Sequence, residues 1–281
     1  MSPVGHPLNT VENEEELMLA LTDVMEFHDA IFKYCNMLHR DISVNNILVV
    51  CDFEGKSASR SVRGLLINYD HAIRVHQQSS SYSRRSGTLP FVSLHNLEAH
   101  ASQRTALDDW ESLLYAICWL VTFGINKPDS KSIVSGHRAK ILKWRKGDMK
   151  QSAYNKCDRM YSLDIFRLDI LAGFQGKYRL LKLLAVDTYN ALFQHQGCEG
   201  ALIQTDGKDE VYETDTKEDV HYLSSDQPSA EQPGRDPFVL RKENEEDIIR
   251  TLLEIIWTAS QRAQRLAHRA ANEGSTATPV Q

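Results

Sequence analysis

The stretch formed by residues 37–50 combines a carboxylate and an amide at a spacing that suits phosphoryl transfer. It reads Met-Leu-His-Arg-Asp-Ile-Ser-Val-Asn-Asn-Ile-Leu-Val-Val, so Asn46 follows Asp41 by five residues. A carboxylate can accept the proton of an attacking hydroxyl group, and an amide oxygen can bind the Mg²⁺ that neutralises phosphates. A short loop can present both groups on successive bends. We therefore predict Asp41 as a catalytic base and Asn46 as a metal ligand, with His39 and Arg40 beside them.

A helix is predicted directly before this loop, over residues 14–35. Asn13 precedes three glutamates, which suits a helix start because its side chain caps the helix and the carboxylates face the positive dipole end. Apolar residues then recur at helical spacing along one stripe. His28 lies on that stripe, where a lone histidine is predicted to be a core residue rather than a ligand. The helix would support the loop from below.

A β-hairpin is predicted directly after the loop. Residues 47–50 and 65–67 are apolar and read as two antiparallel strands, and residues 51–64 read as a long polar connection. The segment Asn68-Tyr69-Asp70-His71 follows the second strand.

Residues 73–85 are polar and rich in serine, and they lead into a turn formed by Ser86, Gly87 and Thr88. Two interpretations stay open for residues 73–85. They could be a segment that a phosphate group orders against Arg40, or a plain flexible loop. The Gly and Pro of residues 87–91 would then fix the turn that returns the chain to the core.

The helix that begins near residue 108 is apolar almost all round, which predicts the central buried helix of the domain. Asp109 in its first turn could accept backbone N–H groups of the 39–46 loop, or it could be an ordinary N-terminal cap. Residues 137–198 are predicted to be mostly helical and to carry no catalytic group. The fold class is therefore mainly α with a small β-hairpin.

Five segments are expected along the 281 residues: a flexible N-terminus (1–13), a main domain (14–203), an acidic and disordered excursion (204–240), an amphipathic helix (241–272) and a flexible tail (273–281). We expect the amphipathic helix to pack on the main domain; binding to a partner or a membrane is the alternative.

The bulk composition excludes several classes of protein. The net charge of −6 gives no basic face for nucleic acid, and no apolar run is long enough to span a membrane. The N-terminus lacks the features of a secretory signal. Five widely spaced cysteines without a C-x-x-C pair favour a reducing compartment, so an intracellular protein of the cytoplasm or nucleus is expected.

Taken together, the motifs resemble the fungal-type protein kinase family and cover the C-terminal, helical lobe of a protein kinase. The resemblance spans about residues 14–200 and rests on residues 39–48, 66–72, 85–91 and 108–115. It implies ATP and Mg²⁺ as cofactors, a protein Ser or Thr hydroxyl as acceptor, and an activation segment that includes Ser86, Gly87 and Thr88. It also implies that Arg40 anchors this segment and that Asp109 braces the loop.

The sequence departs from the family pattern at several places. Asn68 stands at the aspartate that binds Mg²⁺, Ser43 stands where many kinases keep a phosphate-binding lysine, and His95 replaces a glutamate. The resemblance thus implies Asn68, together with Asp70 two residues later, as candidate metal ligands. No Gly-rich loop or strand lysine is found, so we expect the N-terminal β-lobe to be missing from this chain. A separate N-lobe or partner chain is the partner that this would require.

Three functions remain open on these grounds. The chain could be a protein kinase, or a catalytically dead pseudokinase that binds a partner, as Asn68 suggests. A small-molecule phosphotransferase is the third, and Arg40 together with the Gly87–Phe91 turn argues against it. Whether the chain is an enzyme is therefore left open by the sequence.

Overall fold

The fold is built around an N-terminal helix, α1 (Glu14–Cys35), which begins where the sequence predicts. The Asn13 side chain accepts hydrogen bonds from the backbone N–H groups of Glu15 and Glu16, at 2.8 and 3.1 Å. Asn36 ends the helix in the left-handed conformation, with φ 50°. The structure is a computed structural model, which describes residues 5–11, 13–52, 61–77, 86–97, 104–124, 136–174, 177–193 and 244–275.

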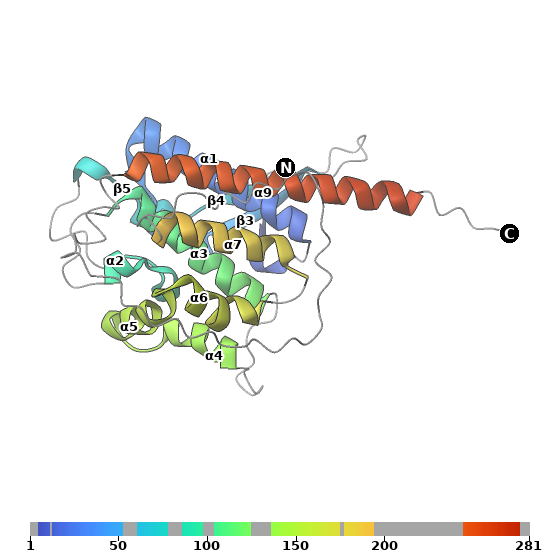
Figure 1. Cartoon of the computed structure of the whole chain (residues 1–281). Helices are drawn as coiled ribbons and strands as arrows, with labels where there is room; N and C mark the ends of the chain where they lie inside the picture. The colour runs from blue at the N-terminus through green and yellow to red at the C-terminus, as the bar shows by residue number, and fades with distance from the viewer. Residues whose placement is uncertain are drawn as a thin grey trace.

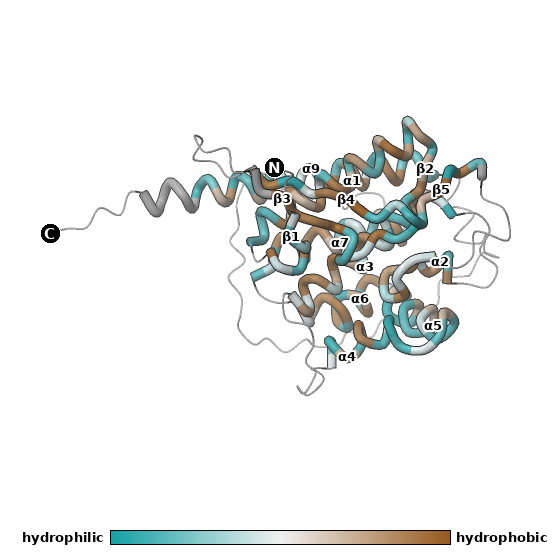
Figure 2. The backbone as a smooth tube through the Cα atoms, turned by 180° about the vertical axis from the view of Figure 1, so that it is seen from behind, coloured by the Kyte–Doolittle hydropathy of each residue, from teal (hydrophilic) through white to brown (hydrophobic). Residues whose placement is uncertain are grey.

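The predicted hairpin is confirmed, but its strands are longer than expected. β3 (Ile47–Asp52) and β4 (Ser61–Leu66) pair antiparallel, with Leu48 opposite Leu65. Much of β4 reads as a polar loop in the sequence because it contains Ser, Arg and Gly. Val62 and Leu66 nevertheless alternate toward the core, which is the pattern of a half-buried strand. Figure 2 shows β3 largely in the hydrophobic colour.

The N-terminal residues differ from the expected flexible lead-in over 1–13. In the described part, β1 (His6–Pro7) pairs with β3, and the 3-10 turn Leu8–Thr10 follows it. Leu8 is fully buried in the core. A second small sheet joins β2 (Met37–Leu38) to β5 (Ile73–Arg74), on either side of the loop that carries Asp41.

The central helix, α3 (Ala106–Phe123), is confirmed as the buried axis of the domain, because all but one of its residues are buried. Around it lie α2 (Leu94–Leu97), α4 (Gly136–Leu142), α5 (Met149–Met160), α6 (Leu163–Asp169) and α7 (Arg179–Phe193). The mainly helical prediction for residues 137–198 therefore holds as far as Phe193. Figure 1 shows α3 and α7 in the middle of the molecule, with α4, α5 and α6 on one side.

The last helix, α9 (Glu245–Ser275), lies along α1 and α7 on the opposite side of the molecule from α4 and α5 (Figure 1). Its buried residues include Ile249, Leu252 and Ile256. The Thr22 hydroxyl of α1 lies 3.4 Å from the Ile256 carbonyl oxygen and donates to it. None of the helices in the described ranges is both long and apolar enough to cross a membrane.

The close packing of β4 on α1 at Gly64 can be tested by adding a side chain at this position. A Cβ atom at this position would lie 1.9 Å from the carbonyl oxygen of Ala20 in α1, which only a backbone shift could relieve. We expect Gly64→Ala to lower the free energy of unfolding by about 1–3 kcal/mol, as overpacking does. Urea denaturation measures the change. Gly136→Ala is the control, because nothing lies within 4 Å of its Cβ; equal effects of the two changes would contradict this packing.

Candidate active site

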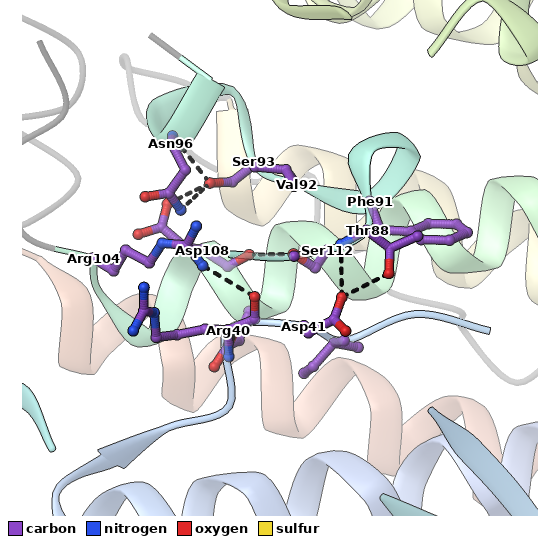
Figure 3. Close-up of a pocket in the computed structure, with 13 residues that line it drawn as sticks. Arg40, Asp41, Thr88, Phe91, Val92, Ser93, Asn96, Arg104, Asp108 and Ser112 are labelled. Atoms are coloured by element: carbon purple, nitrogen blue, oxygen red, sulfur yellow. Dashed lines mark hydrogen bonds between the residues drawn. The ribbon is translucent and has the colours of Figure 1, made fainter. Parts of the chain in front are cut away.

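The carboxylate of Asp41 is held from two sides. Its Oδ1 atom accepts hydrogen bonds from the backbone N–H and the hydroxyl of Thr88, at 2.7 and 2.8 Å, as Figure 3 shows. Its Oδ2 atom accepts a third bond, from the Asn46 amide nitrogen at 2.8 Å. Asp41 is only 8% exposed. The carboxylate is therefore fixed in orientation, between the 39–46 loop and the segment that contains Thr88.

Asn46 closes the loop on which Asp41 lies. Its side-chain nitrogen also donates to the Asp41 carbonyl oxygen at 2.7 Å, and its backbone N–H donates to the Ser43 carbonyl oxygen at 3.0 Å. Its own carbonyl oxygen accepts the N–H of Ile67 at 2.9 Å. These bonds join the loop to the end of the hairpin. The predicted base, Asp41, and the predicted metal ligand, Asn46, therefore lie next to each other.

Asn68 extends this network beyond the hairpin. Its side-chain nitrogen lies 3.3 Å from the Oδ1 atom of Asn46, and its backbone is left-handed, with φ 68°. Asp70 lies exposed in the 3-10 turn Tyr69–His71 that follows. Within the described ranges, no three His, Cys, Asp or Glu side chains are grouped so that they could hold a metal ion. At the place where the sequence predicts a metal, the side chains of Asn46 and Asn68 are thus uncharged amides that hydrogen-bond to each other.

Asp109 of α3 holds the backbone of the loop. Its Oδ2 and Oδ1 atoms accept the N–H groups of His39 and Arg40, each at 2.9 Å. The His28 Nε2 atom lies 2.7 Å from Oδ2. Burial raises the pKa of Asp109, but the hydrogen bond and charge of His28, together with His39, outweigh burial and leave the pKa below its ordinary value. Asp109 is thus a buried carboxylate that faces its donors.

His39 lies between the loop and the Asn68 turn. Its Nε2 atom lies 3.0 Å from the Ile67 carbonyl oxygen, and its ring meets the Tyr69 ring edge to face, with centroids 4.7 Å apart. Burial lowers the pKa of His39, while the charge of Asp109 opposes the shift. The His39 Nδ1 atom lies 3.3 Å from the backbone nitrogen of Asp41, so this histidine packs the loop against the hairpin and contacts the backbone of Asp41.

Two residues of the site were not predicted from the sequence. His28 was placed in the core, but its bond to Asp109, 81 positions away, has no local signal. Arg104 donates to the carbonyl oxygens of Arg40 and Ser86, at 3.0 and 2.6 Å. It lies in a polar stretch before α3, where a charged residue ordinarily indicates exposure.

The structure fully buries Ser43, which sequence reasoning placed at a phosphate. Its neighbours Ile42 and Val44 are also buried, so the loop turns this side chain into the core rather than toward a ligand. Of the segment predicted over residues 73–85, residues 78–85 lie outside the described residues. Ser86, Gly87 and Thr88 are described and lie against the loop, with Gly87 at φ 116°.

A pocket lies between the 40–42 loop, residues 87–96 and the start of α3. Its lining includes Arg40, Asp41, Thr88, Asn96 and Asp108 (Figure 3). Two arginines and three aspartates thus line a small polar pocket next to the Asp41 carboxylate. The pocket has room for about one water molecule.

The segment after Thr88 is anchored from below by α3 and α5. The Leu94 N–H donates to the carboxylate of Glu111 at 2.6 Å, and the Lys156 amine donates to the Val92 carbonyl oxygen at 2.5 Å. His95, which replaces the glutamate of the family pattern, has its Nδ1 atom 3.3 Å from the Oδ1 atom of Asp108. Glu111 and Lys156 therefore hold this segment, in place of the glutamate that the resemblance implies at position 95.

These features fit a site of the protein kinase type: a carboxylate, an amide five residues later, and a buried aspartate that holds the backbone directly before the carboxylate. Comparison with protein families agrees, because residues 1–121 match the model described as "Fungal protein kinase". The matched residues include the loop, the hairpin and most of α3. A search of curated proteins returned no match.

Lys156 generates a prediction for the dependence of stability on pH. Burial lowers its pKa from 10.5 to about 7, although the charge of Glu111 opposes the shift. Between these two values the unfolded chain binds one more proton than the folded chain, so this group makes the free energy of unfolding rise with pH. Relative to Lys156→Met, the wild type should gain stability from pH 7 to 9.5, by at most about 1.4 kcal/mol per pH unit.

Chemical denaturation of both proteins at each pH measures this difference, in which the titration of all other groups cancels. A difference that stays constant across the range would show that Lys156 keeps its ordinary pKa in the folded state.

Proposed function

We propose that this chain carries the catalytic lobe of a protein kinase, which transfers the γ-phosphoryl group of Mg·ATP to a Ser or Thr hydroxyl of a protein. One observation carries the proposal. The Asp41 carboxylate is oriented jointly by Asn46 on its own loop and by Thr88 on the following segment. A base held in this way is ready to receive a proton at a fixed place.

In the proposed reaction, the substrate hydroxyl hydrogen-bonds to Asp41 and attacks the γ-phosphorus. The new O–P bond forms as the bond to the β,γ-bridging oxygen breaks, the hydroxyl proton passes to Asp41, and ADP leaves. Thr88 and Asn46 keep the carboxylate aimed at the hydroxyl. Asp109 contributes through the loop backbone, because it holds the N–H groups of His39 and Arg40.

Magnesium would arrive with the nucleotide, as part of the substrate. Asn46 is the residue proposed to bind it, with Asn68 and Asp70 as further oxygen donors. Mg²⁺ prefers anionic oxygens, so a site with two amides binds it weakly. The proposal therefore relies on the nucleotide phosphates for most of the metal's ligands.

A second candidate, a pseudokinase that binds a partner, is favoured by a specific contact. The Asn68 amide nitrogen faces the Asn46 oxygen that a metal would need. A donor at this position competes with a cation, whereas an aspartate there would attract one. A small-molecule phosphotransferase has less support, because Thr88 belongs to a segment that packs on the base and is anchored by Glu111 and Lys156.

The free thiols of Cys35 and Cys118 support the further proposal of an intracellular, reducing location. A separate N-lobe or partner chain, which would supply the phosphate-binding lysine, is part of the same proposal.

Asp41→Asn tests the base. An amide keeps the shape of the side chain but cannot accept the proton, so phosphate transfer from radiolabelled Mg·ATP to a generic protein substrate should fall about 10²-fold or more. Melting temperature checks that the variant is folded. Transfer by the wild type that survives unchanged in Asp41→Asn would rule out this residue as the base.

Asn68→Asp separates the two candidates. Restoring a carboxylate should tighten the binding of Mg·ATP by about 10–100-fold, equivalent to roughly 1.4–3 kcal/mol. Calorimetric titration with Mg·ATP, and with ATP and EDTA as control, measures the change. Transfer that appears only in Asn68→Asp would identify the wild type as a pseudokinase, whereas transfer by both would support the kinase.

A further inference from the structure

The backbone of Arg40 is the point where several parts of the site meet. Its φ of 71° lies in the left-handed region, which is costly for a residue with a side chain. Its N–H donates to Asp109, and its carbonyl oxygen accepts the Arg104 Nη1 atom at 3.0 Å. The two polar groups of this residue are thus held from opposite ends, which offsets the cost of the conformation.

Arg104 reaches a second backbone group with the other arm of its guanidinium. The Nη2 atom donates to the carbonyl oxygen of Ser86 at 2.6 Å. Arginine is suited to this task because its planar fork presents several donors in a fixed geometry. One buried side chain, 4% exposed, therefore joins the 39–46 loop to the segment that begins at Ser86.

The bridge lies two residues from the contact that orients the base. Gly87 follows Ser86, and a Cβ on Gly87 would lie 3.1 Å from the Arg40 carbonyl oxygen, the same atom that Arg104 binds. Thr88 comes next and donates twice to Asp41. The position of Thr88 on the carboxylate thus depends on how Ser86 and Gly87 are seated against Arg40.

The charges around Arg104 explain why it can be buried here. Asp108, Asp109 and Asp41 favour its charged form, which opposes the desolvation that lowers its pKa. Arg40 lies near enough that Arg104 contributes to lowering the pKa of Arg40 to about 10, after burial as the larger cause. Two cations and three carboxylates therefore share this part of the site.

We propose that Arg104 is a positioning residue for Asp41: it ties the carbonyl oxygens of Arg40 and Ser86 together, and so seats Thr88 on the catalytic carboxylate. This inference rests on the proposed function for its catalytic meaning, but the tie itself is measurable without activity. Arg104→Ala removes both bonds, and Arg104→Lys can restore one of them because an ammonium group lacks the fork.

Amide hydrogen exchange, followed by NMR on the full chain, tests the tie. In Arg104→Ala, exchange at the Thr88 N–H should speed up at least tenfold. Exchange should stay unchanged at the Leu94 and Gly64 N–H groups, which Glu111 and Asp23 hold elsewhere. Arg104→Lys should give an intermediate rate at Thr88. Arg250→Ala, an exposed arginine on α9, is the matched control and should change none of these rates.

Two outcomes would overturn the inference: an unchanged Thr88 rate in Arg104→Ala, or equal acceleration at Thr88, Leu94 and Gly64, which reports only lower global stability. In the transfer assay, Arg104→Ala should lower kcat at least tenfold and leave KM for ATP within twofold. If the wild type transfers no phosphate, the exchange rates still decide the tie, so the failure of the proposed function is separable from the failure of this inference.

Discussion

A single buried carboxylate, that of Asp109, is the constraint on which the site depends. A carboxylate removed from water is stable only where donors replace its hydration, and here the His39 and Arg40 N–H groups and the His28 ring surround it. These donors come from α1 and from the loop, whereas Asp109 belongs to α3. The solvation of one charge therefore fixes how three parts of the chain meet.

The same requirement explains the order of the groups beyond Asp109. A loop held at His39 and Arg40 presents Asp41 next, and the Asp41 carboxylate is completed by Asn46 and Thr88. The base is thus well determined in orientation, whereas the metal side of the site rests on neutral amides. In the proposed phosphoryl-transfer site, the base is thus held by several hydrogen bonds and the metal ligands are weak, so this chain offers support for both a kinase and a pseudokinase.

Local patterns in the sequence predicted α1, the hairpin and the buried α3, because capping, alternation and continuous apolarity leave signals within a few residues. The spacing of Asp41 and Asn46 predicted the candidate site, and the family resemblance predicted that Asp109 braces its loop. His28, Arg104 and Lys156 were not found, since each acts through a contact with residues more than 60 positions away. The extent of β4 was missed because Gly64 and Arg63 resemble a loop in sequence but fit a strand that packs closely on α1.

The position of α9 has a consequence for how this domain assembles. A hydrogen bond from Thr22 to Ile256 spans 234 positions, and the apolar face of α9 covers α1, the helix that ends just before the 39–46 loop. Closing such a long loop costs conformational entropy before the contact contributes any stabilising free energy, so contacts this distant in sequence tend to form late in folding. Because α9 begins more than 200 positions after α1 ends, the face of α1 that it covers stays open during synthesis until α9 has been made.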